Sequence, residues 1–177
     1  AEKTLIPYLK SRGVSHLDVL VLTHTDTDHM GDMLEVAKHF SIKEVYVSKG
    51  SLTQPDFVEK LGRMQTRVYA VEVGDRLPIF DGALQVLYPE DTGDGSNDDS
   101  VVLYGKFFGT SFLFTGDLEE NGEATLMRRF PQLKVDVLKA GHHGSKGSSS
   151  PEFLEQIQPK LALISAGRNN RYKHPHQ

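Results

Sequence analysis

The residues best suited to chemistry stand at positions 24 to 29, which read His-Thr-Asp-Thr-Asp-His and directly follow an apolar segment. Two imidazoles and two carboxylates this close together are costly to gather unless a cation lies among them. His24 and Asp26 are two residues apart and can project to one side, whereas the adjacent Asp28 and His29 are expected to diverge. The stretch therefore predicts ligands shared between two neighbouring metal ions, in preference to a solvated acidic turn with incidental histidines.

Polar groups follow three more apolar segments in the same way, namely Asp117, the adjacent pair His142 and His143, and His174. Glycines on both sides of the histidine pair let the backbone approach a site closely. The proline after His174 keeps that residue extended, which suits a ligand. Asp117 alone would more often be a turn or helix-capping residue. The repetition at the ends of four apolar segments, however, predicts one convergent site.

Composition limits the chemistry of that site. The chain has no cysteine, so any metal must be held by His, Asp or Glu. Its 177 residues, 38% hydrophobic and 25% charged, fit one ordinary globular domain. No apolar run approaches the roughly 20 residues needed to cross a bilayer, and the start lacks the layout of a signal peptide. Both ends interrupt a structural pattern, so we expect a fragment of a longer protein.

Charge is distributed unevenly along the chain. The net charge of −4 argues against bulk electrostatic capture of nucleic acid. From Lys139 to Gln177, however, six basic residues stand against two acidic ones. Lys146, Arg168 and Arg171 in this segment are candidates to bind phosphate groups of a substrate. Ordinary variation of the surface is the plainer alternative.

Hydropathy predicts the elements that must position these residues. Near-continuous or alternating apolar runs predict strands at 16–23, 44–48, 67–73, 76–80, 83–89, 100–108, 111–116, 135–140 and 161–167. Helical spacing predicts helices at 30–40, 54–64, 118–130 and 150–157. Residues 91–100, which are rich in turn-forming residues, predict a polar loop. Two sheets with helices on their outer faces, in a single domain spanning 1–177, would satisfy this order.

As an ordered set, the motifs HTDTDH, NDDS, LFTGD, HHGS and RNNRYKHP resemble the metallo-β-lactamase superfamily, whose signature is His-x-His-x-Asp-His. Within it they look like the subfamily found in ComEC-type competence proteins, which are membrane channels for DNA uptake. The resemblance implies an α/β fold, a four-layer αββα sandwich. The opening strands of the superfamily, which usually carry an Asp-x-Gly motif, are not in this chain, so one sheet is expected to be short.

The resemblance also implies a ligand set for two divalent metal ions, manganese or zinc. His24, Asp26 and His142 would hold one ion, Asp28, His29 and His174 the second, and Asp117 would bridge them. The carboxylate-rich set favours manganese. Asp28 would be central to catalysis, and His143 would stabilise the departing oxygen or act as general acid.

Two departures from the superfamily pattern bear on this set. Asp26 replaces the second histidine of the signature. The superfamily also has a histidine in a later motif, its third, and this chain has none at the corresponding position. The corresponding loop offers Asn97 and Ser100 instead, which we expect to contact substrate. His142 would then supply the missing ligand, as in phosphodiesterases that carry a double histidine.

The resulting hypothesis is a metal-dependent phosphodiesterase or nuclease that degrades one strand of DNA during uptake. It would be a soluble domain on the extracellular face of the cell membrane, joined to a membrane-embedded remainder and needing no small-molecule cofactor. Two alternatives remain open from the residues. One is hydrolysis of a small ester or phosphodiester on the same scaffold. The other is a degenerate domain that binds DNA or a partner without chemistry.

Overall fold

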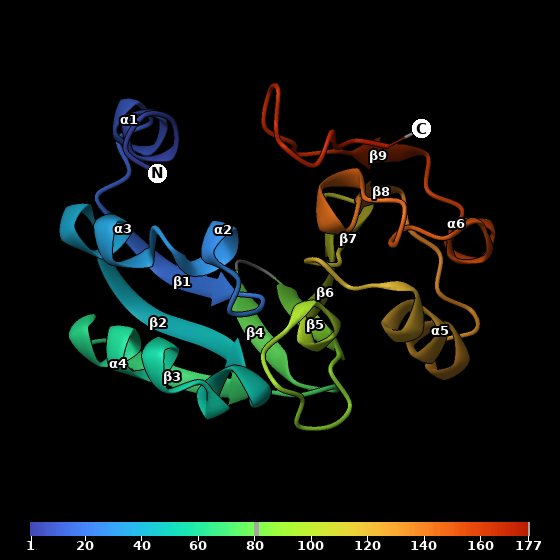
Figure 1. Ribbon diagram of the computed structural model, residues 1–177, viewed down its shortest axis with the longest axis horizontal. Coiled ribbons are helices and arrows are strands. Elements are labelled where there is room, and N and C mark those ends of the chain that lie inside the picture. The colour runs from blue at the N-terminus through green and yellow to red at the C-terminus, as the bar shows by residue number, and fades with distance from the viewer. Residues whose placement is uncertain (80–81, 177) are drawn as a thin grey trace.

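The computed structural model describes residues 1–79 and 82–176 and contains two sheets, which Figure 1 shows side by side. The end of the strand predicted at 76–80 lies outside the described residues. The first sheet is parallel in the order β1-β2-β3 and consists of β1 (His16–Leu22), β2 (Ser41–Ser48) and β3 (Arg67–Val71). Val45 and Val47 of its central strand are completely buried, as the apolar runs predict.

Helices cover the outer face of the first sheet (Figure 1). They are α1 (Leu5–Ser11), α3 (Met33–His39) and α4 (Pro55–Arg63). Their apolar side chains, among them Ile6, Met33 and Phe57, form one core cluster with Val45 and Val47 of β2. Leu22, the last residue of β1, belongs to the same cluster, so the cluster fixes the strand that directly precedes residues 24–29.

The second sheet has six strands in the order β4-β5-β6-β7-β8-β9. They are β4 (Arg76–Ile79), β5 (Gly82–Tyr88), β6 (Val102–Phe107), β7 (Thr110–Phe114), β8 (Val137–Lys139) and β9 (Leu161–Leu163). Pairing is antiparallel from β4 to β7 and parallel from β7 to β9. The carboxyl ends of β7, β8 and β9 therefore meet at one edge, where the polar groups predicted to converge are found.

Two helices, α5 (Glu120–Arg129) and α6 (Pro151–Ile157), pack on the outer face of the second sheet. Phe153 of α6 is fully buried there against Leu113 and Leu138 of the strands. A third cluster, which includes Tyr46, Val86 and Leu103, joins the inner faces of the two sheets. The layers thus run helix, sheet, sheet, helix, and the predicted αββα sandwich is confirmed.

The two sheets are unequal, so part of one inner face is uncovered. Phe114 of β7 and Leu161 and Leu163 of β9 are 37%, 53% and 48% exposed. Cross-strand pairing puts Leu163 beside Lys139 and Lys139 beside Phe114, on one face of the sheet. The short first sheet agrees with the expected absence of the opening strands. No helix in the described part of the chain is long and apolar enough to span a membrane.

The prediction of a single helix at 30–40 missed a break in the helix. The structure has two helices here, the one-turn α2 (Thr27–Met30) and the longer α3, separated by Gly31 and Asp32. A Cβ atom on Gly31 would lie 2.3 Å from the carbonyl oxygen of Thr27, so only glycine fits this junction. The short helix is important because it carries Asp28 and His29.

Candidate metal centre

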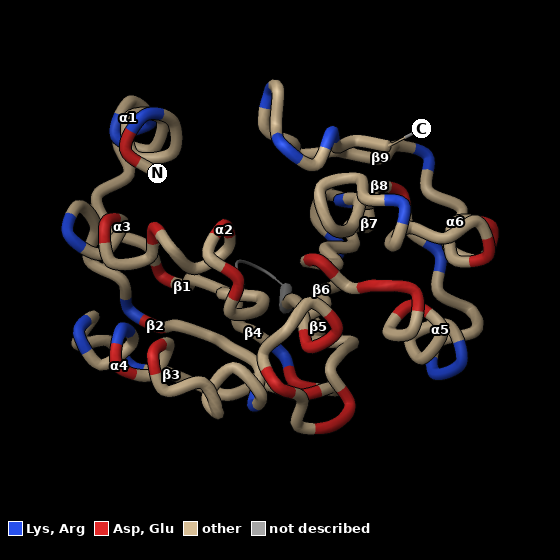
Figure 2. The backbone as a smooth tube through the Cα atoms, in the orientation of Figure 1, with Lys and Arg blue, Asp and Glu red and all other residues tan. Residues whose placement is uncertain are grey.

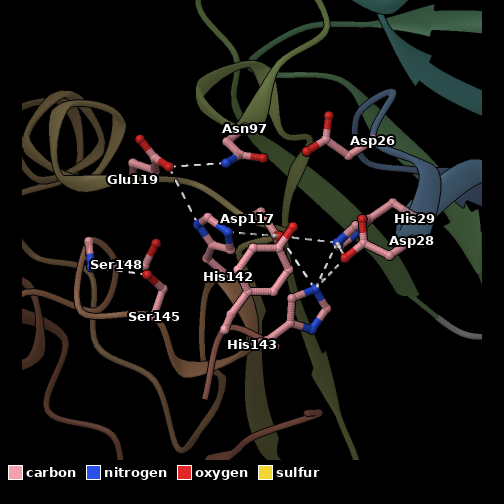
Figure 3. A network of polar contacts seen from close by, with 12 residues as sticks. Asp26, Asp28, His29, Asn97, Asp117, Glu119, His142, His143, Ser145 and Ser148 are labelled. Carbon is pink, nitrogen blue, oxygen red and sulfur yellow. Dashed lines mark hydrogen bonds and ion pairs between the residues drawn. The ribbon is translucent and has the colours of Figure 1, made fainter. Parts of the chain in front are cut away.

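Four side chains from three distant parts of the chain converge on one point (Figure 3). One ligand atom from each lies within 4.8 Å of the others, and the residues are Asp28, His29, Asp117 and His143. Asp117 Oδ2 is 3.1 Å from His29 Nε2 and 3.5 Å from His143 Nε2. His143 Nε2 is in turn 3.1 Å from Asp28 Oδ2 and 3.2 Å from His29 Nε2.

The one-turn helix α2 explains why Asp28 and His29 meet. We expected these adjacent residues to diverge, and that expectation is wrong, because both belong to the four-residue cluster. Successive side chains on a helix are turned by about 100°, less than the half-turn between neighbours on a strand. His29 is mostly buried, whereas Asp28 stays exposed at the rim of the centre.

The histidine pair is presented by a strained turn, η3 (His142–Gly144). His142 and His143 adopt φ values of 44° and 55°, which non-glycine residues rarely do. The following loop is held from behind by the buried Glu123, which accepts hydrogen bonds from the backbone N–H groups of Ser149 and Ser150. Packing around this loop therefore maintains a backbone that places two imidazoles side by side.

Asp117 is the buried centre of the cluster, with its side chain only 3% exposed. Burial by itself would raise the pKa of this carboxyl, but the hydrogen bond from His29 and the neighbouring imidazoles outweigh it and hold the pKa below its usual value. Asp117 Oδ1 has no hydrogen-bond partner among the described residues. A buried, ionised carboxylate with a bare oxygen is well placed to hold a cation.

His24 lies beside this cluster and is completely buried. Its Nδ1 is 3.0 Å from Thr23 Oγ1 and 3.3 Å from Ser100 Oγ, while its Nε2 has no hydrogen-bond partner among the described residues. Burial, together with the charge of His29, lowers the pKa of His24 to about 4. The imidazole is therefore neutral at physiological pH, which metal binding requires. Asp26 Oδ2 is 3.9 Å from His24 Nε2.

His142 reaches the centre from the opposite side. Its Nε2 is 3.9 Å from Asp117 Oδ2, and its Nδ1 is 3.4 Å from Glu119 Oε1. Glu119 also accepts a 3.0 Å hydrogen bond from the amide of Asn97 (Figure 3). Sequence reasoning missed Glu119, although its position two residues after Asp117 was a signal. The contact of Asn97 with substrate stays a prediction, and its amide nitrogen donates this hydrogen bond to Glu119.

Ser100, which the sequence predicts to contact substrate, has a completely buried side chain in this structure. Its hydroxyl accepts a 3.0 Å hydrogen bond from the backbone N–H of Asp117 and lies 3.3 Å from His24 Nδ1. Ser100 therefore helps to position Asp117 and His24 from the interior of the fold. The buried Asp99 holds the same loop by accepting hydrogen bonds from Ser48 Oγ and the backbone N–H of Gly95.

His174 lies next to the four-residue cluster and is not one of its members. Its ring centroid is 5.6 Å from that of His142 and 6.5 Å from that of His143. The three basic residues predicted to bind phosphate, Lys146, Arg168 and Arg171, are all exposed. Figure 2 shows basic positions along the chain after β9, and acidic positions around α2.

Residues 1–168 match the metallo-β-lactamase superfamily, so the chain belongs to it. It is 47% identical to ComE operon protein 3 of Bacillus subtilis (strain 168), across 99% of this chain and 23% of that protein. It is 34% identical to Competence protein ComA of Neisseria gonorrhoeae, across 99% of this chain and 24% of that protein. These relatives confirm the resemblance to competence proteins, and the chain spans about a quarter of their length.

Solved structures show the same fold. CmlA, a diiron beta-hydroxylase from Streptomyces venezuelae, gives a TM-score of 0.58 at 16% identity, covering 84% of this chain and 35% of that one. The metallo-beta-lactamase fold protein YhfI from Bacillus subtilis gives 0.50 at 10% identity, covering 85% of this chain and 67% of that one. At these identities the likeness shows the fold alone.

The fold of this superfamily implies divalent metal binding, and the residues present fit it. Imidazole nitrogens and carboxylate oxygens are the only ligand atoms of the cluster, a set that suits zinc, manganese or iron. The unpartnered buried atoms His24 Nε2 and Asp117 Oδ1 are what a bound cation would satisfy.

Proposed function

We propose that this chain is a metal-dependent phosphodiesterase that acts as a nuclease on DNA during uptake. The observation that carries the proposal is the convergence of Asp28, His29 and His143 on the buried Asp117, with His24 beside them. The likeness to Competence protein ComA supports the choice of DNA over other substrates. Degradation of one strand, with the other entering the cell, is the form of the reaction that we propose.

Two metal ions, manganese or zinc, would fit the ligands in two overlapping groups. Asp28, His29 and His143 would hold one ion. His24, Asp26 and His142 would hold the other, and Asp117 would bridge the two. His143 thereby takes the ligand position that we expected for His174, because it lies 3.1 Å from Asp28 and His174 is outside the cluster.

The orientation of the His143 ring supports its role as a ligand. Its Nδ1 is 2.8 Å from the carbonyl oxygen of Ser165, and a carbonyl can only accept a hydrogen bond. This bond occupies Nδ1, so Nε2 is the ring nitrogen that faces Asp28 and Asp117. A metal ion between these groups would be bound through Nε2, and we therefore favour a ligand over the general acid that we first expected.

The substrate would be bound by the metal ions and by charged residues around the centre. Two metal ions, when bound, would acidify the attacking water and neutralise charge on the phosphoryl oxygens. The exposed Asp28 stands at the rim, where a phosphodiester would enter. Arg168, Arg171 and Lys146, which are exposed, would attract the phosphates on either side despite the net charge of −4.

The place of the chain in a larger protein is also part of the proposal. The relatives are about four times longer, so a further part of each lies outside the matched region. We propose that this chain is a soluble domain on the extracellular face of the membrane, with DNA and the membrane-embedded remainder of the same protein as its partners. DNA would then reach the metal centre before entry.

The direct test is cleavage by the purified chain loaded with manganese or zinc. Single-stranded DNA, double-stranded DNA, bis-p-nitrophenyl phosphate and a lactam reporter would be compared. We expect manganese-dependent cleavage of DNA that Asp28→Ala and His29→Ala abolish, with His16→Ala as a control because His16 is exposed and distant in the fold. Equal DNA cleavage by the metal-free chain or by Asp28→Ala would refute the proposal. Turnover of bis-p-nitrophenyl phosphate without DNA cleavage would favour a small-molecule hydrolase.

A further inference from the structure

A small cavity of about 230 Å³ opens directly beside the metal centre. Asp28 and His143 of the centre form one side of it. The other side comes from the segment that follows β9 and consists of Ser165, Ala166, Gly167, Asn170, Tyr172 and His174. The cavity is smaller than the pockets that hold drug-sized ligands, so it suits a single small group.

Two aromatic rings line the far side of this cavity. Tyr172 is 57% exposed, and its ring is stacked on that of His174 with an interplanar angle of 24°. The guanidinium carbon of Arg171 lies 4.5 Å from the centroid of the Tyr172 ring. We call Tyr172 and His174 together the aromatic shelf. It presents a flat face, next to which the guanidinium of Arg171 also donates a hydrogen bond to the Tyr172 hydroxyl.

The shelf is held in place by the side chain of Asn170. Its amide nitrogen donates hydrogen bonds to the carbonyl oxygens of Gly167 and His174, at 2.8 and 2.7 Å. Its amide oxygen accepts a 3.0 Å hydrogen bond from the backbone N–H of His174. An exposed aromatic ring on a loop tied down in this way loses little freedom when it binds a ligand.

We propose that the aromatic shelf is a stacking site for one unpaired nucleobase, next to the phosphate held at the metal centre. The inference rests on the proposed function for the nature of that phosphate. A base would lie over Tyr172 in the place of the Arg171 guanidinium, which would turn to a neighbouring phosphate. The substrate class that this selects is single-stranded nucleic acid.

The chemistry of a single strand matches the arrangement of the cavity. A nucleotide joins an anionic phosphate to a flat base, and the cavity joins a cation-binding centre to a flat ring. Stacking on aromatic side chains is the usual way in which unpaired bases are bound without sequence preference. In a duplex each base is already stacked and paired, so it would have to leave the helix to reach Tyr172.

Binding without metal tests the shelf independently of cleavage. Fluorescence anisotropy would measure the affinity of the full 177-residue chain, in EDTA, for a labelled thymidine oligonucleotide and for an abasic oligonucleotide of equal length. We expect the wild type to bind the abasic strand roughly 5- to 100-fold more weakly. Tyr172→Ala and Tyr172→Leu should remove this difference, whereas Tyr172→Phe should retain it. Tyr8→Ala is the matched control, because Tyr8 is equally exposed on α1, at 62%.

The outcomes separate this inference from the proposed function. Equal affinity of the wild type for the two oligonucleotides, or an undiminished difference in Tyr172→Ala, overturns the stacking site. Circular dichroism of each variant shows whether it is folded, and recovery in Tyr172→Phe excludes a general loss of structure. A base-dependent affinity without any metal-dependent DNA cleavage would sustain the stacking site and overturn the nuclease.

Discussion

The imidazole of His143 donates its Nδ1 hydrogen to the backbone carbonyl of Ser165 at 2.8 Å, across the gap between η3 and the segment after β9. This bond orients the ring so that its other nitrogen, Nε2, lies 3.1 Å from the carboxylate of Asp28. Two segments 115 residues apart in sequence are thereby joined at the rim of the metal centre.

The first prediction concerns His143 as a ligand. His143→Ala should lose one of two bound metal ions and lower DNA cleavage by more than about 100-fold, because ligands contribute more than the outer groups that cost 10- to 100-fold when removed. Metal content after dialysis and single-turnover cleavage are the measurements. His39→Ala is a control in an exposed histidine of α3. Full metal content with slow cleavage would instead assign His143 to proton transfer.

The second prediction concerns Glu119, which lies 3.4 Å from His142 Nδ1. Glu119→Ala should weaken metal binding by about 10- to 100-fold, because the imidazole loses the group that orients it. Glu119→Gln keeps an acceptor oxygen and should recover much of the affinity. Titration of the metal-free chain with manganese or cobalt, with the cobalt absorption spectrum as a second readout, measures the effect. An unchanged affinity and spectrum in Glu119→Ala would rule out this role.

The third prediction concerns the buried hydroxyl of Ser100. Ser100→Ala leaves the backbone N–H of Asp117 without its partner, which should lower the free energy of unfolding by about 1–3 kcal/mol. Metal affinity should fall as well, since His24 loses a neighbour of its Nδ1. Urea denaturation of the metal-free chain isolates the first effect. Ser96→Ala is the matched control on the exposed part of the same loop, and an equal stability of the two variants would contradict the prediction.

The fourth prediction concerns the pH dependence of stability. Asp136 accepts hydrogen bonds from Lys160 and from both the backbone N–H and the hydroxyl of Ser111. The Lys160 ammonium, with these donors, holds the pKa of Asp136 well below its ordinary value of 3.8. A lowered carboxyl pKa stabilises the fold above the unfolded pKa, and that contribution is lost as pH falls through the folded pKa.

Asp136→Asn should therefore unfold at lower urea than the wild type at pH 7, and the difference should shrink as the pH falls below about 4. Urea midpoints measured from pH 7 to pH 3 give the comparison. Asp91→Asn, in an exposed loop position, serves as the control. A difference that is constant across this range would show that the ion pair is not its cause.

The sequence predicted the nine strands found in the described part of the chain, and their two-layer arrangement, because apolar runs that are buried in a sheet are visible in the chain itself. It missed the one-turn helix α2, because the helix predicted at 30–40 corresponds to α3 and the apolar period gives no sign of a separate turn at Thr27–Met30. Gly31, which follows α2, donates a hydrogen bond to the carbonyl of Thr27 and leaves no room for a Cβ atom, which is a property of the folded backbone. The strand at 44–48 was also too short, since β2 begins at Ser41.

For the ligand set, too, some features were visible in the sequence and others depended on the folded structure. The motifs around His24, Asp117 and His142 predicted a metal centre, because clustered donors at the ends of strands are a local feature of the sequence. Whether Ser100 faces a substrate or the interior was decided by burial, which a polar loop does not reveal. Glu119 was missed because an acidic residue at the start of a helix has an ordinary explanation as a favourable first-turn charge.

The sequence by itself determined which metal ligands this protein could offer. It has no cysteine, so the ligands are imidazoles and carboxylates, and they stand at the ends of buried strands in an αββα sandwich. Only the tertiary structure decided that His143, and not His174, completes the cluster with Asp28, His29 and Asp117. Both histidines follow strands, and nothing in their spacing distinguishes them. The choice depends on the left-handed turn at His142 and His143 and on the Ser165 carbonyl, which orient one ring inward through contacts between segments remote in the chain.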